Sequence, residues 1–235
     1  MSPGSLADGL RTFLRGIGQT LITLGLIVLL FCVYELYGTN VYTAREQTQL
    51  GQSLRHAWAA SPTPPAGPGR KVLVGAQLGS GIAVLWIPRV GMVGKDAKVV
   101  VEGVSHEDLK KGPGHYPGTA LPGVVGNVVI SGHRTTYGAP FNRLDELKVG
   151  DAVVIETRTT WFTYRMVGQQ IVSPNAVQVT YAVPGQRTAR PTQKLLTLTT
   201  CNPKYSASQR LIVRAFLQSV LAKSAGNPPA LTGKA

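Results

Sequence analysis

The feature that most constrains this chain is an uncharged, apolar run near its N-terminus. The nineteen residues from Gly16 to Tyr34 carry no charge, and the stretch from Leu21 to Val33 is strongly apolar. As a helix, nineteen residues are roughly 28 Å long, which is about the thickness of a hydrocarbon core. The sequence therefore predicts one transmembrane helix, and the rest of the chain must fold outside the bilayer.

A cleaved signal peptide is the alternative explanation for such a run. It has a shorter apolar stretch that ends in small residues at a cleavage site, whereas Tyr34 and Tyr37 follow here, as in the aromatic belt of a membrane interface. The Lys/Arg count is equal on the two flanks, but Arg15 lies at the edge of the run and Arg45 well beyond it. We therefore expect a retained single-pass anchor in the cell membrane, with a cytoplasmic N-terminus and an extracytoplasmic domain.

Composition divides the chain into five parts. We expect a cytoplasmic tail at 1–15, a transmembrane helix at 16–37, an extracytoplasmic stalk at 38–70, a folded domain at 71–222 and a flexible tail at 223–235. The stalk comprises a largely polar helix, Asn40–Ala60, and a Pro/Gly-rich linker, Ser61–Gly69. The last segment is rich in Gly, Pro and Lys, which is typical of a frayed terminus.

The charge balance and the cysteines limit the possible partners. The chain has 24 Lys and Arg against 11 Asp and Glu, and every charged residue after Glu156 is basic. This favours an anionic neighbourhood, such as a membrane face or an acidic polymer. The scarcity of aromatic residues argues against nucleic acid. The two cysteines, Cys32 and Cys201, do not cluster with the four histidines, so we expect neither a metal site nor a cofactor.

From Ile82 onward the chain consists of short β-branched runs separated by Gly, Pro, Asn and Asp. We expect strands at Ile82–Ile87, Lys98–Glu102, Asn127–Ser131, Ala152–Thr157, Thr160–Val167, Gln170–Val172, Val177–Thr180, Lys194–Thr199 and Arg210–Leu217. Only His106–Lys111 and Phe141–Leu147 are expected to be helical. The lack of a helix after each strand argues against a parallel α/β sheet. The fold class is therefore all-β, and periodicity leaves a closed antiparallel barrel and a sandwich open.

Three residues at predicted strand ends could carry chemistry. Cys201 closes one strand, Arg210 begins the next, and His133 follows the strand Asn127–Ser131. Taken singly, each residue has a common structural explanation: a buried thiol, a hydrogen-bonded histidine and a solvated cation. Taken together, they supply a nucleophile, an acid/base and a fixed cation, which are the groups that acyl transfer needs.

These residues also lie in motifs that resemble a known family. The string Leu196–Cys201 (Leu-Thr-Leu-Thr-Thr-Cys) followed by Arg210 is similar to the active-site signature of sortases, the membrane-anchored cysteine transpeptidases of Gram-positive bacteria. The segments Gly112–Ala120 and Ser131–Phe141 resemble class E most closely. The resemblance runs from about Ile82 to Leu217, and the anchor and stalk agree with it.

The resemblance implies a fold and a reaction. The fold would be an eight-stranded β-barrel. Cys201 would cleave a C-terminal sorting signal between Thr and Gly and form a thioester. His133 would move the protons, and Arg210, with help from Thr200, would hold the substrate and stabilise the oxyanion. An amine of a peptidoglycan precursor would then release the product.

The resemblance also suggests a substrate. Class E members prefer Leu-Ala-x-Thr-Gly to Leu-Pro-x-Thr-Gly, so the partners would be secreted proteins that carry the former signal. Tyr116, Ala120 and Leu121 are further candidates for contact with this peptide. Calcium stimulation needs a carboxylate cluster, and the acidic residues of the domain are scattered, so we expect no calcium requirement.

Two other functions remain open at this stage. A pilin-polymerising sortase commonly carries a lid and a second C-terminal membrane span, and this sequence has no apolar C-terminal run or evident lid motif. A catalytically silent wall-binding module is the alternative outside the enzymes. An unreactive thiol at Cys201 would be its signature.

Overall fold

The computed structural model describes residues 3–34, 38–60 and 77–233. The chain forms two compact units, Met1–Thr39 and Asn40–Ala235. The linker Ser61–Gly69 and the start of the predicted domain at residue 71 lie outside the described residues. The first unit contains helix α1 (Pro3–Val33), in which Asp8–Val33 is long and apolar enough to cross a membrane. The helix therefore begins earlier than the predicted boundary at residue 16.

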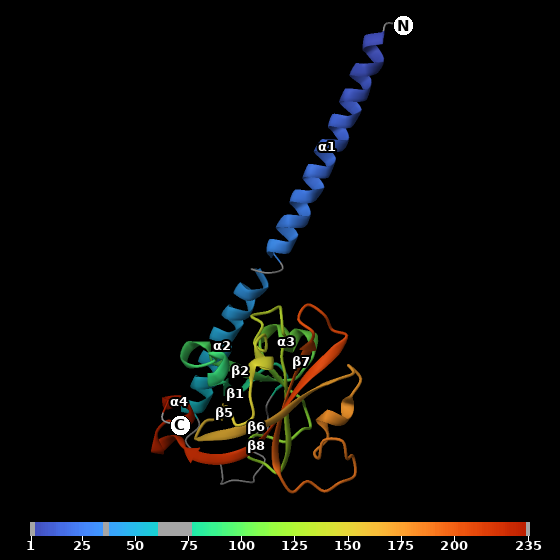
Figure 1. The fold of residues 1–235 in the computed structure, drawn as a ribbon. Helices are drawn as coiled ribbons and strands as arrows, with labels where there is room; N and C mark the ends of the chain where they lie inside the picture. Colours follow the sequence, from blue (N-terminus) through green and yellow to red (C-terminus); the bar gives the residue numbers. More distant parts are fainter. Residues whose placement is uncertain (1–2, 35–37, 61–76, 234–235) are drawn as a thin grey trace. The chain divides into compact units, whose positions relative to one another are not determined.

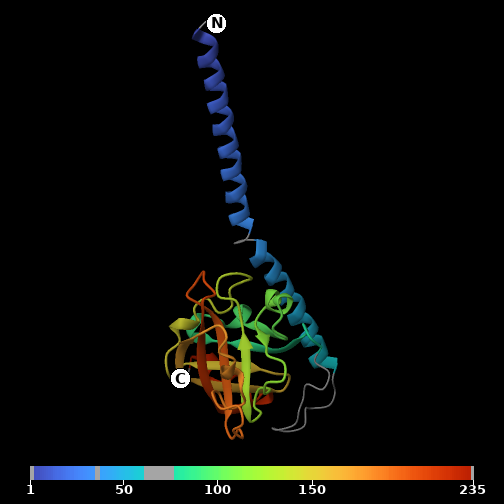
Figure 2. The same cartoon turned by 90° about the vertical axis from the view of Figure 1, so that its right-hand side faces the viewer.

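The second unit is a closed β-barrel (Figures 1 and 2). Its strands are β1 (Gly81–Trp86), β2 (Lys98–Glu102), β3 (Gly114–His115), β4 (Gly126–Ser131), β5 (Ala152–Glu156), β6 (Thr160–Val172), β7 (Lys194–Asn202) and β8 (Gln209–Ala222). Around the barrel their order is β1-β2-β3-β4-β7-β8-β6-β5. The pairs β2–β3 and β4–β7 are parallel and the other neighbours are antiparallel, so the barrel is not antiparallel throughout, as we expected from the sequence. The expected all-β class is confirmed, and the barrel is the architecture.

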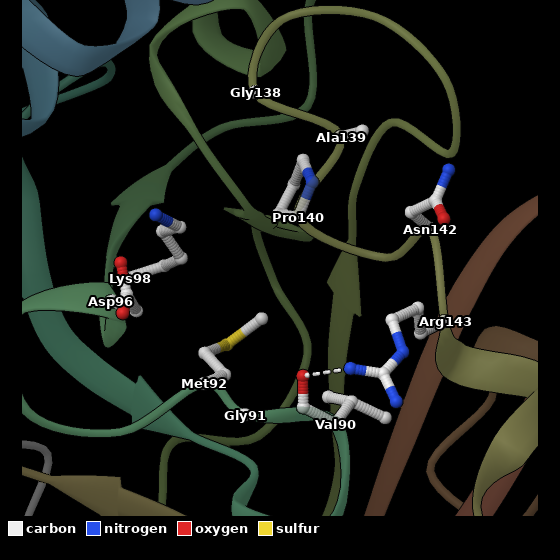
Figure 3. Close-up of a pocket in the computed structure, with 10 residues that line it drawn as sticks. All are labelled: Val90, Gly91, Met92, Asp96, Lys98, Gly138, Ala139, Pro140, Asn142 and Arg143. Carbon is white, nitrogen blue, oxygen red and sulfur yellow. Dashed lines mark hydrogen bonds between the residues drawn. The ribbon is translucent and has the colours of Figure 1, made fainter.

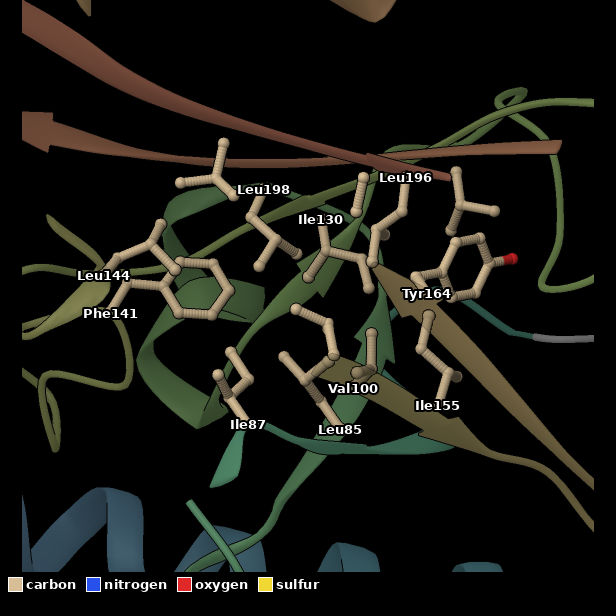
Figure 4. Packing of buried hydrophobic residues seen from close by; sticks show 14 of the residues in the cluster. Leu85, Ile87, Val100, Ile130, Phe141, Leu144, Ile155, Tyr164, Leu196 and Leu198 are labelled. Atoms are coloured by element: carbon tan, nitrogen blue, oxygen red, sulfur yellow. The ribbon is translucent and has the colours of Figure 1, made fainter. Parts of the chain in front are cut away.

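Alternate residues of each strand fill the barrel interior. On β4 and β7 these are Val128, Ile130, Leu196 and Leu198, each at most 1% exposed. Figure 4 shows Ile130, Leu196 and Leu198 packed against residues from the other strands, with Tyr164 beside them. Because successive side chains of a strand point to opposite faces, the residues between them face outward. The register of the core thus decides which side chains can form a site on the outer face.

Several predicted elements differ from the structure. The two expected strands Thr160–Val167 and Gln170–Val172 are one long strand, β6, with a register shift between Met166 and Gly168. The expected strand Val177–Thr180 is wrong: this segment is a 3-10 helix, η5, that pairs with no strand. The expected helix Phe141–Leu147 is reduced to the 3-10 helix η4 (Leu144–Glu146), whereas His106–Lys111 forms α3 as predicted.

Helix α2 (Thr39–Ala60), in the segment that we predicted to be a stalk, packs on the barrel. Gln47 carries the contact: its amide donates to the carbonyls of Val99 (3.0 Å) and Lys111 (2.8 Å), and its Oε1 accepts from the backbone N–H of Val99 at 2.7 Å. Leu54 is also buried, at 6% exposure. The polar character of α2 reflects these side-chain contacts as well as its exposed face.

The C-terminal segment also contacts the barrel. It contains the 3-10 helix η6 (Lys223–Ala225) and the short helix α4 (Pro229–Thr232). Ala230 and Leu231 pack against the small apolar cluster of Ala152, Val154 and Trp161. The segment that we predicted to be a tail thus contributes two side chains to this cluster.

Candidate active site

Cys201 and Arg210 lie directly opposite each other on neighbouring strands. Strand β7 pairs antiparallel with β8, and Cys201 is the register partner of Arg210. Directly opposite residues place their side chains on the same face, with Cβ atoms about 5 Å apart. Leu196 and Leu198 point inward, so alternation turns Cys201 and Arg210 to the outer face. A hairpin register thus brings the thiol and the guanidinium together.

His133 reaches the same rim through a different pairing. Strand β4 runs parallel to β7, with Ser131 level with Thr199. His133 and Cys201 each follow these partners by two residues, so they lie at the same end of the barrel. The three residues that the sequence singled out therefore lie at the same end of the barrel.

The backbone around His133 is held on both sides. Gly132 donates its N–H to the carbonyl of Thr199 (3.1 Å), and the His133 carbonyl accepts from the N–H of Phe141 (3.0 Å). A Cβ at position 132 would come within 2.7 Å of the Phe141 ring, so glycine is needed for this close approach. The fully buried Phe141 packs in the interior (Figure 4). The core thereby fixes the position of the histidine backbone.

The imidazole of His133 is partly buried and keeps one nitrogen unpartnered. Its Nε2 is buried and has no hydrogen-bond partner among the described residues. The ring lies 5.0 Å from that of Tyr137, centroid to centroid. Burial, with a smaller contribution from the charge of His106, lowers the pKa of His133 from its usual value. The neutral imidazole is therefore the main form at neutral pH.

Tyr137 connects the histidine to the helices outside the barrel. Its backbone has φ = 52°, a left-handed conformation that is rare for a bulky residue. On its other side, its ring meets that of His106, on α3, edge to face at 6.1 Å. The next residue, Gly138, donates its N–H to Oδ1 of Asn40 on α2 at 2.8 Å. Helices α2 and α3 thus support the segment that covers His133.

A second arginine, Arg134, contacts the cysteine backbone, and sequence reasoning did not identify it. Its Nη1 donates to the carbonyl of Cys201 (3.1 Å) and to Oδ1 of Asn202 (2.7 Å). Its Nη2 pairs with the carboxylate of Asp145 at 3.0 Å. A lone arginine is usually a solvated charge, so its residue type did not mark it. Its place directly after His133 was the only signal in the sequence.

The guanidinium of Arg210 is held by its own loop. Its Nη1 donates to the carbonyls of Ala207 and Gln209, each at 2.9 Å. Its Nε and Nη2 make no hydrogen bond within the described part of the chain. Two donor positions therefore remain available to a ligand beside Cys201.

Thr200 lies on the opposite face of β7 from Cys201. It is 2% exposed, and its hydroxyl donates to the carbonyl of Gly132 at 2.7 Å. The side chain therefore connects β7 to the end of β4. It does not face the surface that carries the thiol.

The predicted peptide contacts run along β4, away from the rim. Tyr116 donates its N–H to Val129, and Ala120 donates to Asn127. By register, Val129 is level with Thr197 on β7, four residues before Cys201, or roughly 13 Å at the usual strand rise. Ala120 and the adjacent Leu121 lie further away. The outward-facing residues of β4 and β7 on this path, Val129, Thr197 and Thr199, are themselves buried.

A pocket of about 240 Å³ lies next to the segment that follows His133 (Figure 3). Residues 138–140 and Asn142 form one wall, and the turn after β1, with Met92, forms another. Arg143 donates to the carbonyl of Val90 across it at 3.3 Å. Cys201, His133 and Arg210 are not among its lining residues. Within the described residues, no group of three or more His, Cys, Asp and Glu is arranged to hold a metal ion.

Comparisons with known proteins agree on one family. The family model of the sortase domain matches residues 85–218. Sortase SrtE1 of Streptomyces coelicolor is 34% identical over 225 residues, which are 92% of this chain and 60% of that protein. The chain thus spans less than two thirds of the length of this relative.

Solved structures give the same family. Sortase E from Streptomyces avermitilis superposes with a TM-score of 0.60 at 44% identity, covering 66% of this chain and 99% of that one. Sortase E1 from Streptomyces coelicolor, solved with a tripeptide in its active site, gives a TM-score of 0.59 at 35% identity and covers the same shares.

Proposed function

This chain belongs to the sortase family as a class E member, and from that premise we propose that it cleaves a C-terminal sorting signal and transfers the acyl group to an amine. The signal is Leu-Ala-x-Thr-Gly, cut between Thr and Gly, and the acceptor is an amine of a cell-wall precursor. The observation that carries the proposal is the register that pairs Cys201 with Arg210 beside His133.

The first half of the proposed reaction forms a thioester. The thiolate of Cys201 attacks the carbonyl carbon of the signal's Thr, and the carbonyl oxygen becomes an oxyanion. The free Nε and Nη2 donors of Arg210 stabilise this charge. Protonated His133 donates its proton to the nitrogen of the departing Gly, the peptide bond breaks, and the acyl group remains on sulfur.

The second half reverses these roles. The acceptor amine attacks the thioester carbonyl and gives a proton to the now neutral His133. The carbon–sulfur bond breaks, an amide forms, and Cys201 is released as thiolate. Because burial lowers the pKa of His133, only a minority of free molecules carry the imidazolium needed for the first step. Slow turnover follows from this population.

We assign different roles toward the substrate to the four predicted peptide-contact residues. An extended four-residue signal spans roughly 13 Å at the usual strand rise, whereas Tyr116 lies that far along the strands and also on the opposite side of β4 from β7, so we assign it to the first residue of the signal or the residue before it. Ala120 and Leu121 lie beyond that length and would contact residues that precede the signal. Thr200 acts through its hydrogen bond to Gly132 and not through contact with the peptide.

The proposed setting is the outer face of the cell membrane. The apolar helix α1 anchors the chain, the N-terminus is cytoplasmic, and the barrel is extracytoplasmic. The substrates are secreted proteins with the sorting signal. The excess of basic residues after Glu156 suits a neighbourhood of anionic wall polymers or headgroups.

The test uses the full chain in detergent with two quenched peptides, one with Ala and one with Pro at the second signal position, and an added amine. The proposal predicts cleavage after Thr, ligation to the amine and a preference for the Ala peptide, all lost in Cys201→Ala. Cleavage of the Pro peptide alone would contradict the substrate assignment. A folded chain whose Cys201 is inert toward both peptides and toward alkylating agents would be a wall-binding module instead.

A further inference from the structure

Arg134 is a charged side chain inside the protein, directly after His133 in the sequence. It is only 4% exposed, although arginine is rarely buried without partners. Removing a guanidinium from water is costly unless hydrogen bonds replace the lost hydration. The position of this residue therefore requires a set of acceptors built around it.

Three acceptors surround the guanidinium, and two of them belong to the strand end that carries the thiol. They are the carbonyl of Cys201 and Oδ1 of Asn202, both on Nη1. The third is the half-exposed carboxylate of Asp145 on Nη2. The planar fork of an arginine can serve acceptors in several directions at once, whereas a lysine ammonium is a compact point charge.

The backbone of Arg134 is fixed as well. Its carbonyl accepts from Nδ2 of Asn142 at 2.9 Å. The preceding carbonyl, that of His133, accepts from Phe141. The guanidinium therefore extends from a segment with little freedom to move, and its contact with the Cys201 carbonyl fixes the distance between two strand ends that are far apart in sequence.

We propose that Arg134 is a positioning residue that holds the backbone of Cys201 at a fixed distance from His133. This inference rests on the proposed function of Cys201 and His133. The bond from Nη1 to the Cys201 carbonyl orients the peptide unit that carries the thiol, and the covalent bond to His133 ties the same side chain to the imidazole. One residue thereby sets the geometry of both groups, without touching the reacting atoms.

The expected effect is large because proton transfer and attack depend steeply on distance. A displacement of about 1 Å in a catalytic group can cost about a hundredfold in rate. Arg134→Lys keeps a positive charge near Asp145 but replaces the two separate donor nitrogens, Nη1 and Nη2, with a single ammonium nitrogen. We expect it to lower kcat for peptide cleavage by roughly 10- to 100-fold with KM within about twofold.

The matched control is Arg143→Lys. Arg143 lies in the same segment and also serves several acceptors, namely both carboxylate oxygens of Glu146 and the carbonyl of Val90. Its side chain is 52% exposed and makes no contact with the Cys201 strand end among the described residues. We expect this variant to keep the wild-type kcat and KM.

A second measurement needs no peptide. In a Cys32→Ala background, the rate at which iodoacetamide alkylates Cys201 reports the coupling of the thiol to His133. We expect Arg134→Lys to slow alkylation roughly tenfold when His133 is present and to change it less than about twofold in a His133→Ala background. If Arg134→Lys does not fold, Asn202→Ala can be measured in its place. This variant removes one acceptor of Arg134 at a half-buried position, and we expect the same pattern with a smaller effect.

The outcomes separate the two proposals. Equal slowing in both histidine backgrounds, or wild-type kcat in a folded Arg134→Lys chain, would overturn the positioning role. If the wild-type chain cleaves neither peptide but the alkylation rates show the coupling, the substrate proposal fails and the role of Arg134 stands. A loss of melting temperature with unchanged kcat per folded molecule would assign Arg134 to stability alone.

Discussion

The hydroxyl of Thr200 offers a sharp test of how the site is held together. It donates to the carbonyl of Gly132 at 2.7 Å in a buried position. Thr200→Val keeps nearly the same shape and removes only this hydrogen bond. A buried carbonyl left without its donor costs about 1–3 kcal/mol. With a urea m-value of about 2 kcal/mol per M, the unfolding midpoint should fall by roughly 0.5–1.5 M.

The same change should act on catalysis through geometry. The lost bond connects the residue before Cys201 to the residue before His133, so we expect kcat to fall by about tenfold. KM should stay unchanged, because the side chain faces the barrel interior. The assays are urea unfolding followed by tryptophan fluorescence, and steady-state cleavage of the Leu-Ala-x-Thr-Gly peptide.

Two variants control this experiment. Thr200→Ser retains the hydroxyl and should keep most of the stability. Thr199→Val alters the neighbouring buried threonine, whose hydroxyl makes no hydrogen bond among the described residues, and should shift the midpoint less. If Thr200→Val were as stable as wild type and raised KM, Thr200 would contact the peptide directly and would not act through its hydrogen bond to Gly132.

Further predictions concern pH, the docked helix and metal dependence. His106→Gln removes a charge that lowers the pKa of His133, so we expect the pKa of His133 to rise. The limb of the pH–rate profile that depends on His133 should then move to higher pH. An unmoved limb would show that the charge of His106 does not lower this pKa. Gln47→Ala removes three hydrogen bonds between α2 and the barrel and should lower the free energy of unfolding by about 1–3 kcal/mol. Urea unfolding would measure this change, with the exposed Gln52→Ala as the control. Equal stabilities of the two variants would contradict the prediction. A chelator should leave the cleavage rate unchanged, and a loss that calcium restores would show that a metal is required.

The part of the site that is local in sequence could be predicted from the sequence. Cys201 and Arg210 flank a short loop between two β-branched runs, and such strands usually pair with each other. The placement of His133 depends instead on the parallel pairing of β4 with β7, which are more than sixty residues apart. No periodicity encodes that pairing, and we predicted only that His133 follows a strand end.

Other features escaped prediction because side-chain hydrogen bonds decide them. The β-branched segment Val177–Thr180 has high strand propensity, yet Asn127 donates to the carbonyls of Val179 and Tyr181 and the Thr180 hydroxyl bonds back to Val177. These contacts replace a strand ladder. The docking of α2 and the burial of Arg134 likewise depend on individual polar contacts that leave no pattern in the sequence.

The most direct test of the central claim is the intact mass of the full chain after brief mixing with the Leu-Ala-x-Thr-Gly peptide and no added amine. The account predicts an adduct equal to the peptide up to Thr, located on Cys201, removed by hydroxylamine and absent in Cys201→Ala. It also predicts slower adduct formation in His133→Ala. An adduct that persists without the Cys201 thiol, or peptide cleavage at an undiminished rate in Cys201→Ala, would contradict a thioester mechanism.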